Sequence, residues 1–485
     1  MEAVVRNDLA LRDERIPTRE KWMYGIGGLG QNIIYVVVSS FLMFFLTDVY
    51  GISPMATGTM LMIGRIWDGL NDPLMGFIVE GTRTKWGKLR PYLLFCLAPV
   101  ALFTTLSFLG PDFASPTLRL VWCYAMYFFW DLAYTMSDIP YWGLSAAMTS
   151  NTEERTKLLT MTRVLTMVGM AVGVIGIPIL IGALGGATTP EASARISRAQ
   201  NKAAYTNMAL ICSLVGCGLL SLAFFGTKER TTSPEAEKTS FKRSVSTIFR
   251  NIPLMLVLLA SVLGFGRSMT GVSGMYVCMW VFKSTNYYAL LGGVSMVGTI
   301  IAIMLTPLFL KSMSKKRLFI YSSIAGVLIN IGLYIAGNIL TKGSWVVQSA
   351  RDIYLCLGFL FLSSFAGGFF TILQTVMIGD SVDFLEWKTN VRAEGLCFAG
   401  QTFVTKICAA LCTFVFGIIL TTTGYVNQGV ATQSRAALAG IFQSATLWPA
   451  LSCALSIIPI LWYDLDDEKL KGYMAEVKRR KASNK

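Results

Sequence analysis

Long apolar stretches, separated by short polar connections, run along almost the whole chain. About 20 apolar residues in a helix cross the hydrocarbon core of a bilayer, and a helix there satisfies its own backbone hydrogen bonds. The pattern predicts an all-α integral membrane protein with 12 transmembrane helices. We expect these helices at 24–47, 56–80, 91–110, 118–147, 161–185, 205–226, 253–282, 287–310, 318–340, 353–380, 395–424 and 437–463.

The longest polar connection inside the chain, 227–252, divides these helices into two groups of six. We therefore expect a cytoplasmic lead at 1–23, an N-terminal six-helix bundle at 24–226, a cytoplasmic middle loop, a C-terminal six-helix bundle at 253–463 and a basic tail at 464–485. The segment 241–249 of the middle loop is predicted to form a short helix on the membrane surface. In the first helix, the glycine-rich run 25–30 predicts close packing of neighbouring helices.

Basic residues alternate between the two sides of the predicted membrane. The lead, every second connection after it and the tail hold 30 of the 42 Lys and Arg residues, whereas the other connections, counted with Arg119 at the start of the 118–147 helix, hold 8. This asymmetry predicts that both termini are cytoplasmic. The net charge of +14 then reflects membrane topology, and we expect no nucleic-acid partner. Because the lead is polar, no cleavable signal peptide is expected.

Composition narrows the chemistry further. Hydrophobic residues make up 54% of the chain and charged residues only 14%. The ten Cys residues all fall in apolar segments without a CxxC pair, so neither disulfides nor a zinc site is expected. The chain has no His, so a proton relay would have to use carboxylates, and we expect no bound cofactor.

Three charged residues interrupt the second predicted helix: Arg65, Asp68 and Asp72. Their spacing places them on one helical face, and charges at membrane depth are costly and occur mainly along wet pathways. Two carboxylates one turn apart can ligate a monovalent cation, and their mutual repulsion also favours proton binding. We interpret the pair as a coupling site for Na⁺, Li⁺ or H⁺. The alternative is a structural ion-pair cluster around Arg65.

The fourth and fifth helices carry a candidate sugar site. Asp131 and Asp138 are seven residues apart and share a face, and Trp142 follows one turn after Asp138. A sugar needs polar groups for its hydroxyls and an aromatic ring for its apolar face, which Asp138, Arg163 and Trp142 would supply. Alternatively, Arg163 snorkels to the interface and Trp142 is a packing residue. Asn32 in the first helix contacts either a ligand or a neighbouring helix.

The second half of the chain echoes the first in spacing. Asp138 and Arg163 are 25 residues apart, and Asp380 and Lys406 are 26 apart. Internal repeats with a binding site at their interface are typical of secondary transporters. The other polar residues that we single out in the helices of this half are Arg267, Asp383, Gln401 and Thr402.

Four motifs, in order along the chain, carry a resemblance to a known family. They are Arg65-Ile-Trp-Asp68 with Asp72-Pro-Leu-Met-Gly76, Gly87-Lys-Leu-Arg-Pro-Tyr92, Asp138-Ile-Pro-Tyr141, and Asp380-Ser-Val-Asp383 with Glu386-Trp-Lys388. Over residues 20–465 the chain resembles the glycoside–pentoside–hexuronide:cation symporters of the major facilitator superfamily. The resemblance implies two pseudo-symmetric bundles, alternating access, a sugar and a monovalent cation as ligands, and a bacterial inner membrane. We expect a monomer.

The resemblance also implies roles for single residues. It places the cation at Asp68, Asp72 and Thr135. It places the sugar at the positions of Asn32, Asp138, Trp142, Arg163, Gln401, Thr402 and Lys406. It places gating or coupling at Arg65, Asp380 and Asp383. We add Asp131 and Arg267 as candidate substrate residues because they alter the charge near the predicted site.

One position departs from the family pattern. The aspartate that melibiose-type members use for galactoside hydroxyls falls at Asn32, which is preceded by Gln31 in place of Lys. The predicted substrate is therefore a glycoside, a pentoside or a hexuronide, and an anionic sugar (uronic or sulfonated) is the main alternative. A lysolipid transporter and a membrane-embedded transferase are the other readings that we weigh.

Overall fold

The computed structural model describes residues 15–149, 151–230, 251–389, 394–427 and 430–483. These residues form helices and their connections, with an isolated bridge between Thr84 and Gly87 in place of any sheet. The all-α prediction is confirmed for this part of the chain. Most of the predicted middle loop, including the surface helix expected at 241–249, lies outside the described residues.

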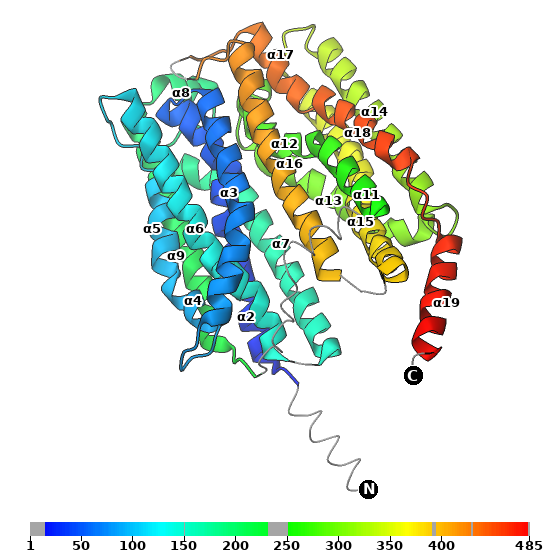
Figure 1. The fold of residues 1–485 in the computed structure, drawn as a ribbon. Coiled ribbons are helices and arrows are strands. Elements are labelled where there is room, and N and C mark those ends of the chain that lie inside the picture. Colours follow the sequence, from blue (N-terminus) through cyan, green and yellow to red (C-terminus); the bar gives the residue numbers. More distant parts are fainter. Residues whose placement is uncertain (1–14, 150, 231–250, 390–393, 428–429, 484–485) are drawn as a thin grey trace. The chain divides into compact units, whose positions relative to one another are not determined.

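The chain divides into two compact units (Figure 1). Unit 1 comprises Met1–Glu237 and Asn427–Ala431, and unit 2 comprises Lys238–Val426 and Thr432–Lys485. The helices of unit 1 are α2 (Thr18–Phe44), η1 (Phe45–Tyr50), α3 (Pro54–Gly81), α4 (Arg90–Phe95), α5 (Leu97–Ser107), α6 (Pro116–Met148), α7 (Thr152–Ala183), α8 (Pro190–Arg195) and α9 (Arg198–Gly226).

The helices of unit 2 follow in the same manner. They are α11 (Ile252–Leu263), η2 (Phe265–Ser268), α12 (Met269–Tyr276), η3 (Val277–Val281), α13 (Tyr287–Phe309), α14 (Lys315–Leu340), α15 (Ala350–Thr389), α16 (Glu394–Thr422), α17 (Arg435–Ser444), α18 (Leu447–Leu461) and α19 (Asp467–Ser483). The segment predicted as a basic tail is thus largely helical.

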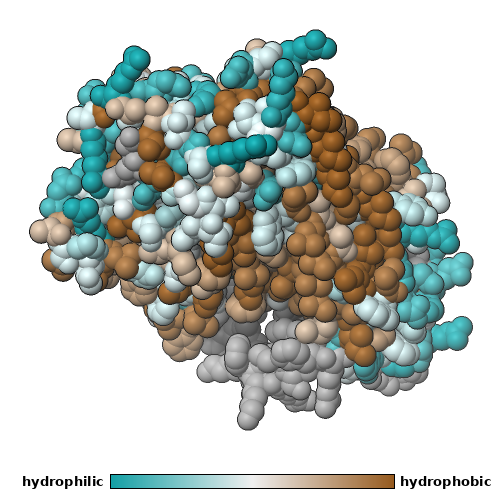
Figure 2. All heavy atoms as spheres, turned by 90° about the horizontal axis from the view of Figure 1, so that it is seen from above, coloured by the Kyte–Doolittle hydropathy of each residue, from teal (hydrophilic) through white to brown (hydrophobic). Residues whose placement is uncertain are grey.

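Within the described residues, nine helices are long and apolar enough to cross a membrane, or ten if the bent pair α11 to η3 is one span. Two long helices, α3 and α6, do not belong to this group. They hold Arg65, Asp68, Asp72, Asp131 and Asp138. The helices that contain the predicted site are therefore the more polar ones. Figure 2 shows broad apolar patches on the surface, as a lipid-facing protein requires.

Helix α2 packs against α7 and α9 through its glycines, as the sequence predicted. A Cβ on Gly30 would lie 2.4 Å from the carbonyl oxygen of Gly216 in α9. A Cβ on Gly169 in α7 would lie 2.4 Å from the carbonyl oxygen of Leu29. Any side chain at Gly30 or Gly169 would force these backbones apart.

Helix α7 begins earlier than predicted. The sequence analysis placed its start at 161, but the helix starts at Thr152 because Asn151 caps it. The Asn151 side chain accepts hydrogen bonds from the backbone N–H groups of Glu153 and Glu154, and acidic residues in a first turn favour the helix dipole. Arg163 therefore lies roughly three turns inside the helix instead of in its first turns.

The predicted helix 253–282 is broken in the structure. Helix α11 ends at Leu263, η2 follows as a 3₁₀ turn, and the two parts of the span are bent by 48°. At the far end of unit 2, α19 docks on α15 through stacked rings of Trp387 and Tyr473, whose centroids are 4.2 Å apart. The indole N–H of Trp387 donates to Glu476 at 2.7 Å.

Candidate functional site

The contact between α3 and α6 positions most of the charged residues in unit 1. Gly64 lies so close to Tyr127 that a Cβ there would be 2.1 Å from the ring. Trp67 packs against Phe128 with ring centroids 4.9 Å apart. Farther along both helices, Thr135 reaches Asp68. Because residue numbers increase along both helices from one contact to the next, α3 and α6 run in the same direction. Asp68 of α3 and Thr135 of α6 therefore lie at the same height along the pair.

Asp68 is the centre of the first group. Its carboxylate accepts a hydrogen bond from the Thr135 hydroxyl at 3.3 Å, and it lies 3.9 Å from the Arg65 guanidinium. Arg65 also lies over the ring of Tyr35 in α2, at 5.7 Å from the centroid. Asp68 and Thr135 are 9% and 3% exposed, so this carboxylate, guanidinium and hydroxyl group is largely shielded from solvent.

Asp72 and Asn71 extend the group by one turn of α3. Asp72 is half-buried. Asn71 is 1% exposed, and its amide nitrogen finds no hydrogen-bond partner among the described residues. Asn71 was not among the predicted site residues, although the spacing of three residues between Asp68 and Asn71 places both on the same face of the helix. The structure thus brings Asp68, Thr135 and Arg65 together and adds an amide to their side of α3.

Asp138, one turn beyond Thr135 on α6, is the centre of the second group. One of its oxygens accepts hydrogen bonds from the Gln31 amide at 2.8 Å and from the Trp142 indole N–H at 3.1 Å. The guanidinium of Arg163 lies over the Trp142 ring, 4.4 Å from its centroid. This geometry joins a carboxylate, an aromatic plate and a cation, which are the parts that a sugar site requires.

Two tyrosines fix α2 against α6 beside this second group. The Tyr24 hydroxyl donates to the carbonyl of Tyr141, and the Tyr141 hydroxyl donates to the carbonyl of Tyr24, both at 2.8 Å. Their rings are stacked with centroids 4.6 Å apart. Both side chains are fully buried, so this reciprocal pair holds the position of Gln31 relative to Asp138.

The structure favours Gln31 over Asn32 as the polar partner from α2. Gln31 is 1% exposed, donates to Asp138, and has an amide oxygen with no hydrogen-bond partner among the described residues. Asn32 donates to the carbonyl of Gly28 in its own helix at 2.9 Å. Helical spacing could have indicated Gln31 from the sequence, because Gln31 shares a helical face with Tyr24, Gly28 and Tyr35 at intervals of three and four residues.

Arg267 lies in η2 and faces the interior of unit 2. Its guanidinium donates to the hydroxyls of Ser323 and Ser456, both at 2.8 Å, and to the Cys453 sulfur at 3.2 Å. It also lies over the ring of Phe370, 3.9 Å from the centroid. These neutral partners hold the charge where the span is bent.

The predicted gating residue Asp380 forms an ion pair inside unit 2. The Lys315 ammonium donates to both oxygens of Asp380, at 2.9 and 2.7 Å. This pair joins α14 to α15 within one unit. Asp383 is half-buried one turn after Asp380.

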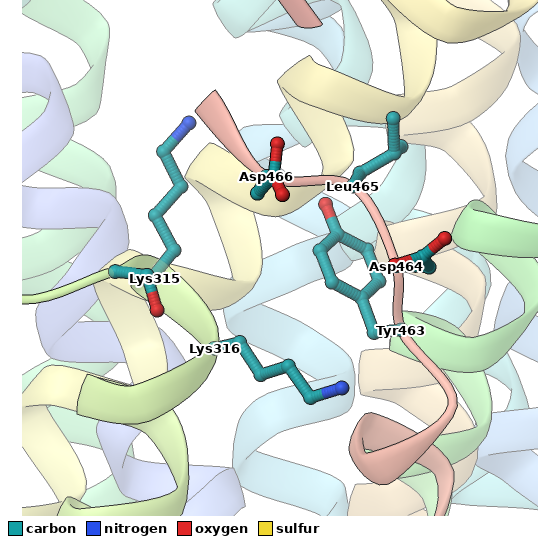
Figure 3. A pocket seen from close by; sticks show the side chains of 7 residues that line it. Lys315, Lys316, Tyr463, Asp464, Leu465 and Asp466 are labelled. Atoms are coloured by element: carbon teal, nitrogen blue, oxygen red, sulfur yellow. The ribbon is translucent and has the colours of Figure 1, made fainter. Parts of the chain in front are cut away.

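A cavity of about 170 Å³ adjoins Lys315 and is lined by Ser314, Lys315, Lys316 and residues 463–466. In Figure 3, Lys316 points beneath Tyr463, while Asp464 and Asp466 lie on the segment after α18.

The remaining predicted residues lie on α16. The Gln401 amide donates to the Thr375 hydroxyl at 3.1 Å, and the Thr402 hydroxyl donates to a backbone carbonyl of its own helix. Lys406 is half-buried one turn farther along. These residues belong to unit 2 and the two groups around Asp68 and Asp138 belong to unit 1.

Comparison with known proteins shows the family of the chain. A family model described as MFS/sugar transport protein matches residues 23–467. The isoprimeverose transporter of Lactiplantibacillus pentosus is 30% identical over 93% of this chain and 89% of its own length. The putative sulfoquinovose importer of Escherichia coli (strain K12) is 29% identical over 96% of this chain and 95% of its own length.

Solved transporters share the fold. The nucleoside transporter NupG has a TM-score of 0.64 and 12% identity, over 92% of this chain and 100% of that chain. A D-xylose-proton symporter has a TM-score of 0.59 and 13% identity, over 91% of this chain and 96% of that chain. At such low identity these likenesses concern the fold alone.

Proposed function

The chain belongs to the MFS sugar transport family, among the glycoside–pentoside–hexuronide transporters, and we propose that it couples uptake of a neutral sugar to a monovalent cation. Family membership makes it a membrane transporter and not an enzyme. One observation carries the proposal: a single helix, α6, contributes Thr135 to the group around Asp68 and, one turn later, Asp138 to the group around Trp142.

The group around Asp68 suits a small cation. Na⁺ and Li⁺ prefer several oxygen ligands at short range, and Asp68, Thr135 and Asp72 supply oxygens from two adjacent helices. The Arg65 guanidinium, 3.9 Å from Asp68, balances part of the negative charge while the site is unloaded. Sodium, lithium and protons are all compatible with carboxylates in this position.

The group around Asp138 suits a neutral sugar. A carboxylate accepts hydrogen bonds from sugar hydroxyls, and the Trp142 ring offers a face for the apolar side of a pyranose. Its partner from α2 is Gln31, a neutral amide at 2.8 Å. A uronic or sulfonated sugar would bring its negative charge near the Asp138 carboxylate, with the Arg163 guanidinium over the Trp142 ring as the balancing cation, and it is the alternative substrate.

The remaining features of the proposal are based on the sequence pattern and on membership of the family. The protein has 12 spans in two six-helix bundles, at 24–226 and 253–463, and α3 and α6 are the two polar spans. Both termini are cytoplasmic, and the protein is a monomer in a bacterial inner membrane. Lys406, Gln401 and Thr402 are further substrate residues, and Asp380 and Asp383 take part in gating. Alternating access then carries both ligands across.

Uptake by purified protein in proteoliposomes tests this function. The panel contains neutral galactosides, pentosides, isoprimeverose, glucuronides and sulfoquinovose, each with a gradient of Na⁺, Li⁺ or H⁺. We expect at least one neutral sugar to accumulate only with a cation gradient. Accumulation of only the anionic sugars would refute the substrate class, and accumulation that ignores every cation gradient would refute coupling. Uptake of a labelled lysolipid alone would refute sugar transport altogether.

A further inference from the structure

Asp131 lies on the same face of α6 as Asp138 but at a different level. Of its helix neighbours, Tyr127 packs against Gly64 and Thr135 reaches Asp68. Asp131 falls between these two positions, and it is therefore level with the part of α3 that carries Arg65. It is 3% exposed. Of the two carboxylates that act electrostatically on Arg65, Asp68 has the larger effect and Asp131 the smaller, and both also act on Tyr127.

We infer that Asp131 is a positioning residue of the cation site: it holds the charge of Arg65, so that Asp68 stays available for the coupling cation. The inference rests on the proposed cation-coupled function and assigns Asp131 to the ion instead of the sugar. Arg65 has a limited choice of anionic partners at this depth. Without Asp131, its guanidinium would turn fully to Asp68 and compete with the cation there.

The geometry supports this role better than a role in sugar binding. The contacts of the sugar group are made around Asp138, two turns farther along α6, through Gln31 and Trp142. Arg65 is 3.9 Å from Asp68, which is longer than a close ion pair, and its side chain is 16% exposed. A guanidinium drawn toward two carboxylates at once fits this intermediate distance.

Asp131→Asn tests the inference. We measure the half-saturating cation concentration for uptake of the best sugar in the panel, and separately the uptake rate at saturating cation. One elementary charge removed at this range changes the cation affinity about tenfold or more. We expect the half-saturating concentration to rise about tenfold while the rate at saturating cation stays within about twofold of wild type. A purely structural defect would lower that rate and leave the half-saturating concentration unchanged.

Two further variants define the mechanism. In an Arg65→Gln background the Asp131→Asn change should raise the half-saturating concentration less than it does in wild type, because the competing guanidinium is gone. An equal rise in both backgrounds would overturn the role through Arg65. Asp131→Glu keeps the charge and tests the inference if Asp131→Asn does not fold. For Asp131→Glu we expect a half-saturating cation concentration within about threefold of wild type. A tenfold rise in Asp131→Glu would overturn the inference.

The controls separate this inference from the proposed function. Glu191→Gln makes the same carboxylate-to-amide change at an exposed residue of α8 in unit 1, and we expect it to behave as wild type. If the wild-type protein shows no cation-dependent uptake, the proposed function fails. If wild type is cation-dependent and Asp131→Asn keeps the same half-saturating concentration, only the inference fails.

Discussion

Replacing Asp138 with Asn isolates the contribution of its charge to sugar binding. Asn keeps one acceptor oxygen of the same shape, so the hydrogen bonds from Gln31 at 2.8 Å and Trp142 at 3.1 Å can both persist. A carboxylate offers about four acceptor positions. Because two of them are occupied here, at most two remain for sugar hydroxyls.

The magnitude follows from those two positions. A hydrogen bond to a charged acceptor contributes about 1.5–3 kcal/mol, against about 0.5–1.5 kcal/mol for a neutral one. In Asp138→Asn the second oxygen becomes an NH₂ group, which can only donate to sugar hydroxyl oxygens, so two hydrogen bonds to a charged acceptor are exchanged for two neutral ones. This exchange costs about 2–3 kcal/mol, or about 30- to 150-fold in affinity. The unfolding temperature should change by less than about 2 °C, because the internal hydrogen bonds survive.

The assay is isothermal titration of detergent-purified Asp138→Asn with the best sugar of the panel, at saturating cation. Glu191→Gln is the matched control, since it exchanges a carboxylate for an amide at an exposed residue of α8. A sugar affinity of Asp138→Asn within about twofold of wild type, with cation-dependent uptake intact, would refute the placement of the sugar at Asp138.

Three further predictions concern other residues. Gln31→Leu should weaken sugar binding about tenfold and Asn32→Leu less than about twofold, because the Gln31 amide donates to Asp138 whereas the Asn32 amide donates to a carbonyl of its own helix. Equal losses of sugar affinity in the two variants, measured by titration, would contradict this prediction. Glu229 accepts hydrogen bonds from three consecutive backbone N–H groups of the 88–90 segment, at 2.8–2.9 Å. Glu229→Gln should therefore lower the unfolding temperature by several degrees. An unchanged thermal melt would show that these hydrogen bonds do not stabilise the fold. The Trp387 indole N–H holds the pKa of Glu476 below its usual range. The stabilisation of α19 by this bond is therefore present above the ordinary Glu pKa and is lost as the pH falls through the lowered one. Hydrogen exchange in α19, corrected for intrinsic rates, should stay unchanged from pH 7 to about pH 5 and increase as the pH falls below about 4.

The sequence predicted the helices well because a membrane leaves the backbone few alternatives. Each apolar stretch had to satisfy its own hydrogen bonds, and among the described residues helices occur over every predicted apolar stretch. The ends were predicted less well where local chemistry extends a helix into polar sequence, as Asn151 does for α7. The break at Gly264 was not predicted, because it goes with the bonds of Arg267 to Ser323 and Ser456, which are distant in sequence.

Helical spacing predicted which site residues share a face but not what each face meets. Asp131 and Asp138 share one face of α6, yet the first is level with Arg65 and the second meets Gln31. Gln31 and Asn32 are adjacent and equally polar, and only the packing of α2 against α6 through Tyr24 and Tyr141 decides between them. The assignment of a polar residue to the ion or the sugar depended on contacts between helices.

The placement of both groups on α6 has a mechanical consequence for the proposed coupling. Thr135 and Asp138 are one turn apart on a continuous helix, so neither can shift along or around the helix axis without moving the other. A cation that draws Thr135 and Asp68 together would therefore also set the orientation of Asp138 toward Gln31 and Trp142. By linkage, a sugar that fixes Asp138 raises the affinity for the cation by the same factor. Helices α3 and α6 of unit 1 then link the proposed cation group to the proposed sugar group.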